Sequence, residues 1–246
     1  LFKKYVLSIM LDDPSDIVII VDSVFSLEKQ YQSDFVHVSP TESKSLFPKD
    51  NYYLKKIIYD QPLVRGALRN IALWCMKKRG WRIEGTLPEE QKFVAILAHH
   101  TSNWDFPVGI SVALHFKVRV FWLGKNTLFL GPMRPLMRWL GGIPVFRTEP
   151  SELVDDVVEF LKHQDKAVIG ITPEGTRGRV TKWKTGFYRI AHALELPIVL
   201  AYLDYDNKIG GVGPIIYPEG DFEADMARIK NFYRTVNGKY PELGSF

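Results

Sequence analysis

Cysteine and long apolar runs are the two features that this sequence has least of. Cys75 is the only cysteine in 246 residues, so the chain can form no internal disulfide, and nothing favours an oxidising compartment. No uninterrupted apolar run reaches the roughly 18 residues that a membrane-spanning helix needs. With 46% apolar residues the chain can nevertheless bury a full core, which excludes an intrinsically disordered protein.

A cluster of metal ligands is also missing. His99 and His100 are neighbours, but the other histidines are scattered and no cysteine accompanies them. Cys75 falls within a predicted helix on its apolar face, which disfavours a role as nucleophile. We therefore expect neither a metal nor a cofactor. The formal net charge of +4 suits an anionic membrane surface or phosphorylated substrates and does not by itself indicate nucleic acid, so we expect no nucleic-acid partner.

From residue 62 onward, strand and helix patterns alternate. The strand candidates are 92–98, 118–123, 143–146, 166–171, 197–203 and 209–216, and the helix candidates are 62–79, 105–116, 133–140, 151–163, 184–195 and 221–235. This order predicts an α/β fold with a mixed, mostly parallel sheet covered by helices. In such sheets, functional sites form where strands end and helices begin.

Two predicted helical segments have alternative surroundings. Residues 62–79 form an amphipathic pattern, which fits a helix lying either on the core or on an anionic bilayer with Trp74 near the interface. Residues 128–140, "LFLGPMRPLMRWL", fit either a helix packed on the core or a segment that lines an acyl groove or touches lipid. In the second case Met133 and Met137 would adapt to flexible chains.

The first strand-to-helix junction, "AHHTSNWD" at 98–105, carries candidate catalytic residues. If His100 ends the strand and Asp105 opens the helix, the turn can bring the carboxylate to the imidazole. The other ring nitrogen could then take a proton from an attacking hydroxyl or amine. The pair by itself favours a structural interpretation, a histidine that caps the helix beside a structural aspartate, and only its context can favour catalysis. Because neighbours on a strand point to opposite faces, only one of His99 and His100 can face the site.

A second junction, "ITPEGTRGRVTKWKTG" at 171–186, combines glycines with cations. Gly175 lets backbone amides approach a ligand closely, Arg177 offers a rigid fork for phosphate, and Lys184 adds a point charge. Glu174 could hold an arginine in place. The alternative is a charged loop in solvent. Arg147, at the end of "GGIPVFR", adds a cation at a third strand end.

These blocks, in this order, resemble the lysophospholipid (glycerophosphate) acyltransferase family. The four matching blocks are "HTSNWD" at 100–105, "GGIPVFR" at 141–147, "EGTR" at 174–177 and "LPIVLA" at 196–201. The resemblance covers about residues 62–236. Gly178 stands where the family often has serine, and the membrane helices of many members are lacking, so the acceptor is the least defined property.

The resemblance implies a fold, a reaction and roles for the residues. The fold would be that of the glycerolipid acyltransferases, and the acceptor hydroxyl would attack the thioester of acyl-CoA or acyl-carrier protein. His100 would be the general base, held by Asp105. Arg147 and Arg177 would bind the acceptor phosphate, while Glu174, Gly175 and Thr176 would shape the site. The expected location is cytoplasmic, peripheral on the inner face of the membrane.

We expect an N-terminal segment at 1–60 ahead of the acyltransferase domain at 61–246, and the segment fits either the trailing part of a fusion or a remnant that packs on that domain. It contains a predicted strand, "DIVIIVDS" at 16–23, and residues 1–58 resemble an internal portion of phosphonate or phosphocholine nucleotidyltransferases. The glycine-rich nucleotide loop of that family is absent from this chain. We therefore expect no productive CTP binding by that route.

Two other functions stay open. One is acyl transfer to an amine or to a non-phosphorylated alcohol. The other is a non-catalytic lipid-binding module, such as a regulatory partner of a nucleotidyltransferase, although a pure binder has little need of a positioned His–Asp pair.

Overall fold

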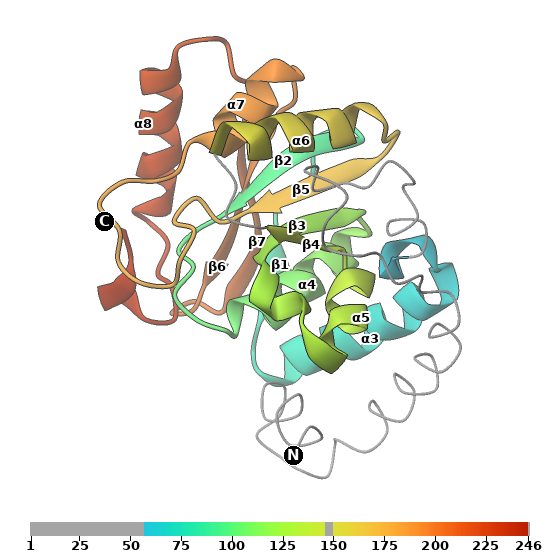
Figure 1. Ribbon diagram of the computed structural model, residues 1–246. Coiled ribbons are helices and arrows are strands. Elements are labelled where there is room, and N and C mark those ends of the chain that lie inside the picture. Colours follow the sequence, from blue (N-terminus) through green and yellow to red (C-terminus); the bar gives the residue numbers. More distant parts are fainter. Residues whose placement is uncertain (1–56, 146–149, 246) are drawn as a thin grey trace. The chain divides into compact units, whose positions relative to one another are not determined.

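The computed structural model describes residues 57–145 and 150–245. The predicted strand at 16–23, the N-terminal resemblance and Arg147 lie outside these ranges. Within them, seven strands form one sheet in the order β1-β7-β6-β2-β5-β3-β4 (Figure 1). The strands are β1 Arg82–Glu84, β2 Lys92–Leu97, β3 Val120–Lys125, β4 Gly142–Val145, β5 Ala167–Ile171, β6 Ile198–Asp204 and β7 Ile209–Ile216.

Most neighbouring strands are parallel, as the alternating pattern predicts. Only the β6–β7 pair is antiparallel among the strand pairs of the described ranges. The predicted fold class is confirmed, and the six predicted strands lie within two residues of their expected positions. The seventh strand, β1, is three residues long with a mostly exposed edge pattern, so its sequence carries no apolar alternation that would reveal it.

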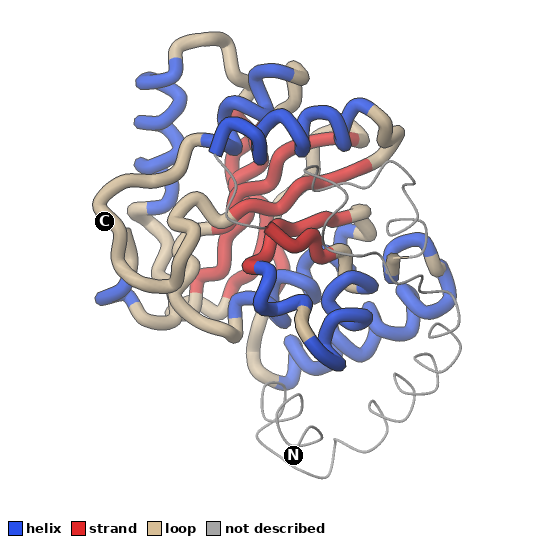
Figure 2. Tube along the Cα trace, in the orientation of Figure 1, coloured by secondary structure: helices blue, strands red, loops and turns tan. Residues whose placement is uncertain are grey.

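Helices cover both faces of the sheet (Figures 1 and 2). They are α3 Pro62–Lys78, α4 Asp105–Phe116, α5 Arg134–Trp139, α6 Pro150–Lys162, α7 Gly186–Ala193 and α8 Phe222–Tyr233, with short 3₁₀ turns η4 Ile58–Asp60, η5 Asn126–Phe129, η6 Gly131–Met133 and η7 Pro241–Leu243. The crossovers through α4 and α5 run toward β4, and those through α6 and α7 run back toward β6. Because parallel crossovers are right-handed, opposite directions place the two helix pairs on opposite faces.

Two groups of buried side chains lock the helix layers to the sheet. On the α6–α7 face, Leu161 and Ile190 pack in the cluster that contains Ile169 of β5. On the other face, Met76 of α3 and Val112 of α4 pack with a side chain of β6. The buried residues Ile57 and Ile58, just ahead of α3, also belong to the larger cluster.

Helix α3 is only half covered. Leu68 and Ala72 pack against the core, whereas Ile71 and Trp74 of the same helix remain 39% and 51% exposed. Leu63 is 89% exposed. No helix in the described ranges is long and apolar enough to cross a bilayer.

The carboxyl ends of β2 and β5 lie side by side and define the edge where the site forms. Ile96 of β2 pairs with Ile171 of β5, so the turns that follow both strands leave the sheet as neighbours. Tyr233, at the end of α8, holds the end of β2 in place through its hydroxyl. Its fully buried hydroxyl donates to the Ile96 carbonyl at 2.7 Å and lies 2.8 Å from the Ala201 carbonyl of β6.

Candidate active site

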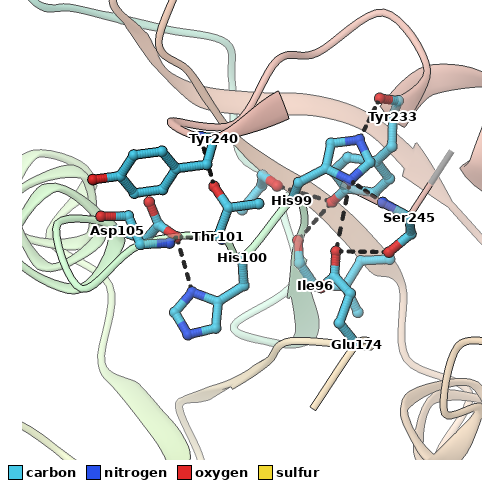
Figure 3. A network of polar contacts seen from close by, with 11 residues as sticks. Ile96, His99, His100, Thr101, Asp105, Glu174, Tyr233, Tyr240 and Ser245 are labelled. Atoms are coloured by element: carbon cyan, nitrogen blue, oxygen red, sulfur yellow. Dashed lines mark hydrogen bonds and ion pairs between the residues drawn. The ribbon is translucent and has the colours of Figure 1, made fainter. Parts of the chain in front are cut away.

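The turn between β2 and α4 brings His100 to Asp105 (Figure 3). His100 Nδ1 lies 2.9 Å from Asp105 Oδ2, and the carboxylate is almost fully buried at the first position of the helix. A negative charge is favoured there because it faces the unpaired amides at the helix start. The predicted His–Asp contact is therefore present in the structure.

Backbone amides in the same turn hold the aspartate. The amides of Thr101 and Ser102 each donate to Asp105 Oδ2 at 3.0 Å. The Ser102 hydroxyl in turn accepts from the Trp104 amide at 3.1 Å, which tightens the turn. The four residues between His100 and Asp105 thus form a turn in which one carboxylate oxygen accepts from both amides and contacts the imidazole.

Tyr205 supplies the remaining contact of the carboxylate. Its hydroxyl donates to Asp105 Oδ1 at 2.7 Å, and burial together with the neighbouring carboxylate raises the pKa of Tyr205 well above its ordinary value. The tyrosine therefore stays protonated as a donor. It comes 100 residues after Asp105 in the sequence, where no motif marks it.

Tyr205 opens the turn that joins β6 to β7, and this turn is internally fixed. The Asp204 carboxylate accepts from the amides of Asp206 and Asn207 at 3.1 Å and from the Asn207 side chain at 2.8 Å. The ring of Tyr205 also packs edge-on against Trp81, with 5.0 Å between centroids. The tyrosine hydroxyl is consequently held on the carboxylate by a rigid hairpin.

The contacts of Asp105 fix the tautomer of His100. Since the carboxylate only accepts, Nδ1 must carry the hydrogen, and Nε2 is left with a free lone pair. The His100 side chain is 23% exposed, and its second ring nitrogen lies on the side away from Asp105 (Figure 3). A histidine with one nitrogen anchored and the other open is the geometry that general-base chemistry requires.

His99 points the other way. Its Nε2 lies 3.0 Å from the Tyr233 carbonyl, and its Nδ1 accepts from the Ser245 amide at 3.3 Å. The ring is buried, away from His100 (Figure 3). The predicted division between the two histidines, with His100 at the aspartate and His99 on the opposite side, is what the structure shows.

The loop after β5 brings together four of the predicted residues. Gly175 has a φ of +64°, and a side chain there would meet the Lys184 ammonium at 2.8 Å, so the lysine lies directly across the glycine. Thr176 and Arg177 are exposed beside them. Only glycine adopts this conformation without strain while leaving room for the lysine.

Glu174 has a different neighbour from the one expected. Its carboxylate is buried beside His99 and Ser245, and in the described ranges it forms no ion pair with an arginine. The Glu174 carboxylate lies on the buried side of the loop, whereas the cations of the loop are exposed. Those ranges likewise contain no group of three or more histidine, cysteine, aspartate or glutamate side chains suited to a metal ion.

Comparison with known proteins places this geometry in a family. The structure is that of an α/β protein with a histidine anchored to a carboxylate at the edge of its sheet. The family model described as Acyltransferase matches residues 81–203, which are 123 of the 246 residues and include the His–Asp turn and the loop after β5. The chain belongs to the acyltransferase family.

A solved structure agrees with this assignment at the level of the fold. The chain resembles the crystal structure of the 1-acyl-sn-glycerophosphate (LPA) acyltransferase PlsC from Thermotoga maritima, with a TM-score of 0.54 and 15% identity. The similarity covers 87% of this chain and 88% of that one. No curated protein matches the sequence significantly. The family resemblance and the fold expected from the four blocks are thereby confirmed.

The tautomer of His100 provides a direct test of the site geometry. In protein labelled with ¹⁵N-histidine, two-bond ¹H–¹⁵N spectra of the neutral ring should show the hydrogen on Nδ1. The Asp105→Ala variant should lose this preference because the acceptor is gone. A wild-type spectrum with the hydrogen on Nε2 would contradict the described contact.

Proposed function

We propose that this acyltransferase moves a fatty acyl group from acyl-CoA or acyl-carrier protein to a hydroxyl of a lysophospholipid or glycerophosphate-like acceptor. The observation that carries the proposal is the 2.9 Å contact between His100 and Asp105, which leaves one imidazole nitrogen accessible within the segment that matches the family. The thioester and the acceptor are both substrates, and the reaction uses no cofactor.

In this reaction His100 moves one proton. Its Nε2 accepts the proton of the acceptor hydroxyl while the oxygen attacks the thioester carbonyl. The tetrahedral intermediate then expels the thiolate, which takes the proton from the imidazolium, and an ester and a free thiol result. Asp105, with its charge held by Tyr205 and the amides of the turn, stabilises the imidazolium between the two steps.

Cations on the loop after β5 support a phosphorylated acceptor. Arg177 and Lys184 are exposed at the end of the strand that pairs with β2, and neither has an ion pair in the described ranges. We assign them, with Arg147 of the second sequence block, to the acceptor phosphate. Gly175 and Thr176 shape the loop, and Glu174 supports it from its buried position.

His100→Ala should abolish most of the turnover. A general base contributes about 10²–10⁴-fold in rate, so acyl-CoA consumption with lysophosphatidate should fall by about that factor. The matched control is His163→Ala, which removes an exposed histidine at the end of α6 and should leave turnover unchanged. Turnover by the His100 variant at the wild-type rate would exclude this residue as the base. Lipid binding by the wild type, with no turnover across a panel of donors and acceptors, would instead favour a non-catalytic lipid-binding module.

Arg177→Ala should weaken binding of a phosphorylated acceptor. Loss of a charge-assisted contact to phosphate should raise the acceptor KM about tenfold or more, with the donor KM unchanged. Arg228→Ala, at an exposed arginine of α8, is the control. An unchanged KM for lysophosphatidate would favour the alternative, an amine or a non-phosphorylated alcohol as acceptor.

We further propose that the protein binds peripherally to the cytoplasmic face of the membrane. Leu128 and Leu130 follow β3 at the carboxyl edge of the sheet and are 49% and 65% exposed, with Lys125 exposed nearby in the sequence. Phe129 between them is buried and stacks on Trp122 at 5.7 Å, so it belongs to the core. The exposed leucines are placed to enter lipid on the side where the acyl chains must arrive.

Replacing both leucines should reduce membrane binding. In flotation with vesicles that contain anionic lipid, Leu128→Ser/Leu130→Ser should bind more weakly than wild type because the apolar area available for insertion is smaller. Tyr217→Ser is the matched control, since Tyr217 is also 49% exposed but lies near Glu90 at the opposite edge of the sheet. Equal flotation of all three proteins would contradict the proposal.

A further inference from the structure

His99 and Glu174 form a buried pair behind the His–Asp turn. His99 Nδ1 lies 3.7 Å from Glu174 Oε1, and the two side chains are only 7% and 3% exposed. One residue adjoins His100, and the other lies three positions before Arg177. The pair therefore links the two segments that the proposed reaction has to hold together.

The histidine ring is fixed by its other contacts. Nε2 donates to the Tyr233 carbonyl at 3.0 Å, and the tyrosine itself is anchored to β2 through its hydroxyl. Ser245 donates its amide to Nδ1 at 3.3 Å. These contacts set the plane of the ring, so the side of the imidazole that carries Nδ1 faces Glu174 (Figure 3).

The carboxylate of Glu174 is joined to that ring through Ser245. Its Oε1 accepts from the Ser245 hydroxyl at a long 3.4 Å, and its Oε2 has no hydrogen-bond partner in the described ranges. Ser245 links this carboxylate to the imidazole, because its hydroxyl donates to Glu174 Oε1 while its amide donates to His99 Nδ1. A charged acceptor strengthens the first of these bonds, and loss of either acceptor would leave a donor of Ser245 without its partner.

The loop transmits the position of Glu174 to its exposed residues. The Gly175 amide donates to the Thr172 carbonyl at 3.0 Å, and the Lys184 amide donates to the Pro173 carbonyl at 2.8 Å. With both ends of the turn tied in this way, a displaced carboxylate would move the backbone that carries Thr176 and Arg177.

We propose that His99 and Glu174 are positioning residues, which hold the acceptor-binding loop in register with the strand end that carries His100. This inference rests on the proposed function, because it assigns the acceptor phosphate to that loop. Neither residue touches the reacting atoms. Their effect reaches the acceptor through Arg177, and the His100–Asp105 pair does not depend on them.

Two substitutions of His99 separate its contacts. His99→Gln keeps a donor where Nε2 faces the Tyr233 carbonyl but removes the nitrogen that accepts from the Ser245 amide beside Glu174. The 260 Å³ cavity beside the ring, lined in part by Gly238 and Gly244, leaves room for the longer side chain. His99→Asn keeps an acceptor where Nδ1 stands, because its amide oxygen can still accept from the Ser245 amide.

The test compares acceptor KM values for lysophosphatidate with donor KM values and thermal unfolding. His99→Gln and Glu174→Gln should each raise the acceptor KM about tenfold and leave the donor KM unchanged, whereas His99→Asn should restore most of the affinity. His163→Gln is the matched control, because His163 also lies 3.7 Å from a glutamate oxygen but both side chains are exposed. If His99→Gln does not fold, the isosteric Glu174→Gln variant provides the same comparison.

Arg177→Ala separates this inference from the proposed function. In that background His99→Gln should have no further effect on the acceptor KM, because its effect passes through Arg177. The positioning role is overturned if His99→Gln raises the acceptor KM equally in the wild-type and Arg177→Ala backgrounds. It is also overturned if Arg177→Ala raises the acceptor KM but His99→Gln in the wild-type background does not. If Arg177→Ala alone has no effect, the proposed phosphate contact fails. The pair is then judged by His99→Gln and Glu174→Gln together, and additive losses in kcat/KM would overturn it.

Discussion

The burial of one carboxylate organises the site. Asp105 is almost completely removed from water, and a charge in that position is tolerated only if donors surround it. Two amides, one imidazole and one tyrosine hydroxyl meet this demand. The same four contacts shape the turn after β2, start α4 and orient His100, so local folding and the proposed chemistry have one physical cause.

Two tyrosines from later in the chain stabilise the end of β2 and the turn that follows it. Tyr205 contacts Asp105 from the β6–β7 turn, and Tyr233 of α8 joins the end of β2 to the middle of β6. Burial raises the pKa of both hydroxyls well above the ordinary value, so each stays protonated and donates. The strand end that carries the two histidines is thus held from both sides.

Local patterns in the sequence predict most of the fold and the central pair of the site. Helix α4 spans 105–116 as its pattern predicts, and the four-residue spacing distinguishes His100 from His99. Strand β1 is too short to show a period. The contact of Tyr205 with Asp105 and that of His99 with Glu174 could not be predicted for a different reason. Each joins segments at least 75 residues apart in the sequence, which come together only when the sheet forms. The catalytic and binding roles of the site residues remain predictions.

The hairpin that carries Tyr205 has a consequence for how the sequence can vary. Surface turns usually tolerate insertions and deletions, because nothing depends on their register. Here Asp204 fixes the turn and Tyr205 leaves it toward a buried carboxylate. One residue more or fewer between β6 and β7 would disturb the Asp204 contacts that fix the turn, and with them the support of the Tyr205 hydroxyl. We therefore expect the length of this surface turn to be constant among active relatives, although the lengths of surface turns usually vary.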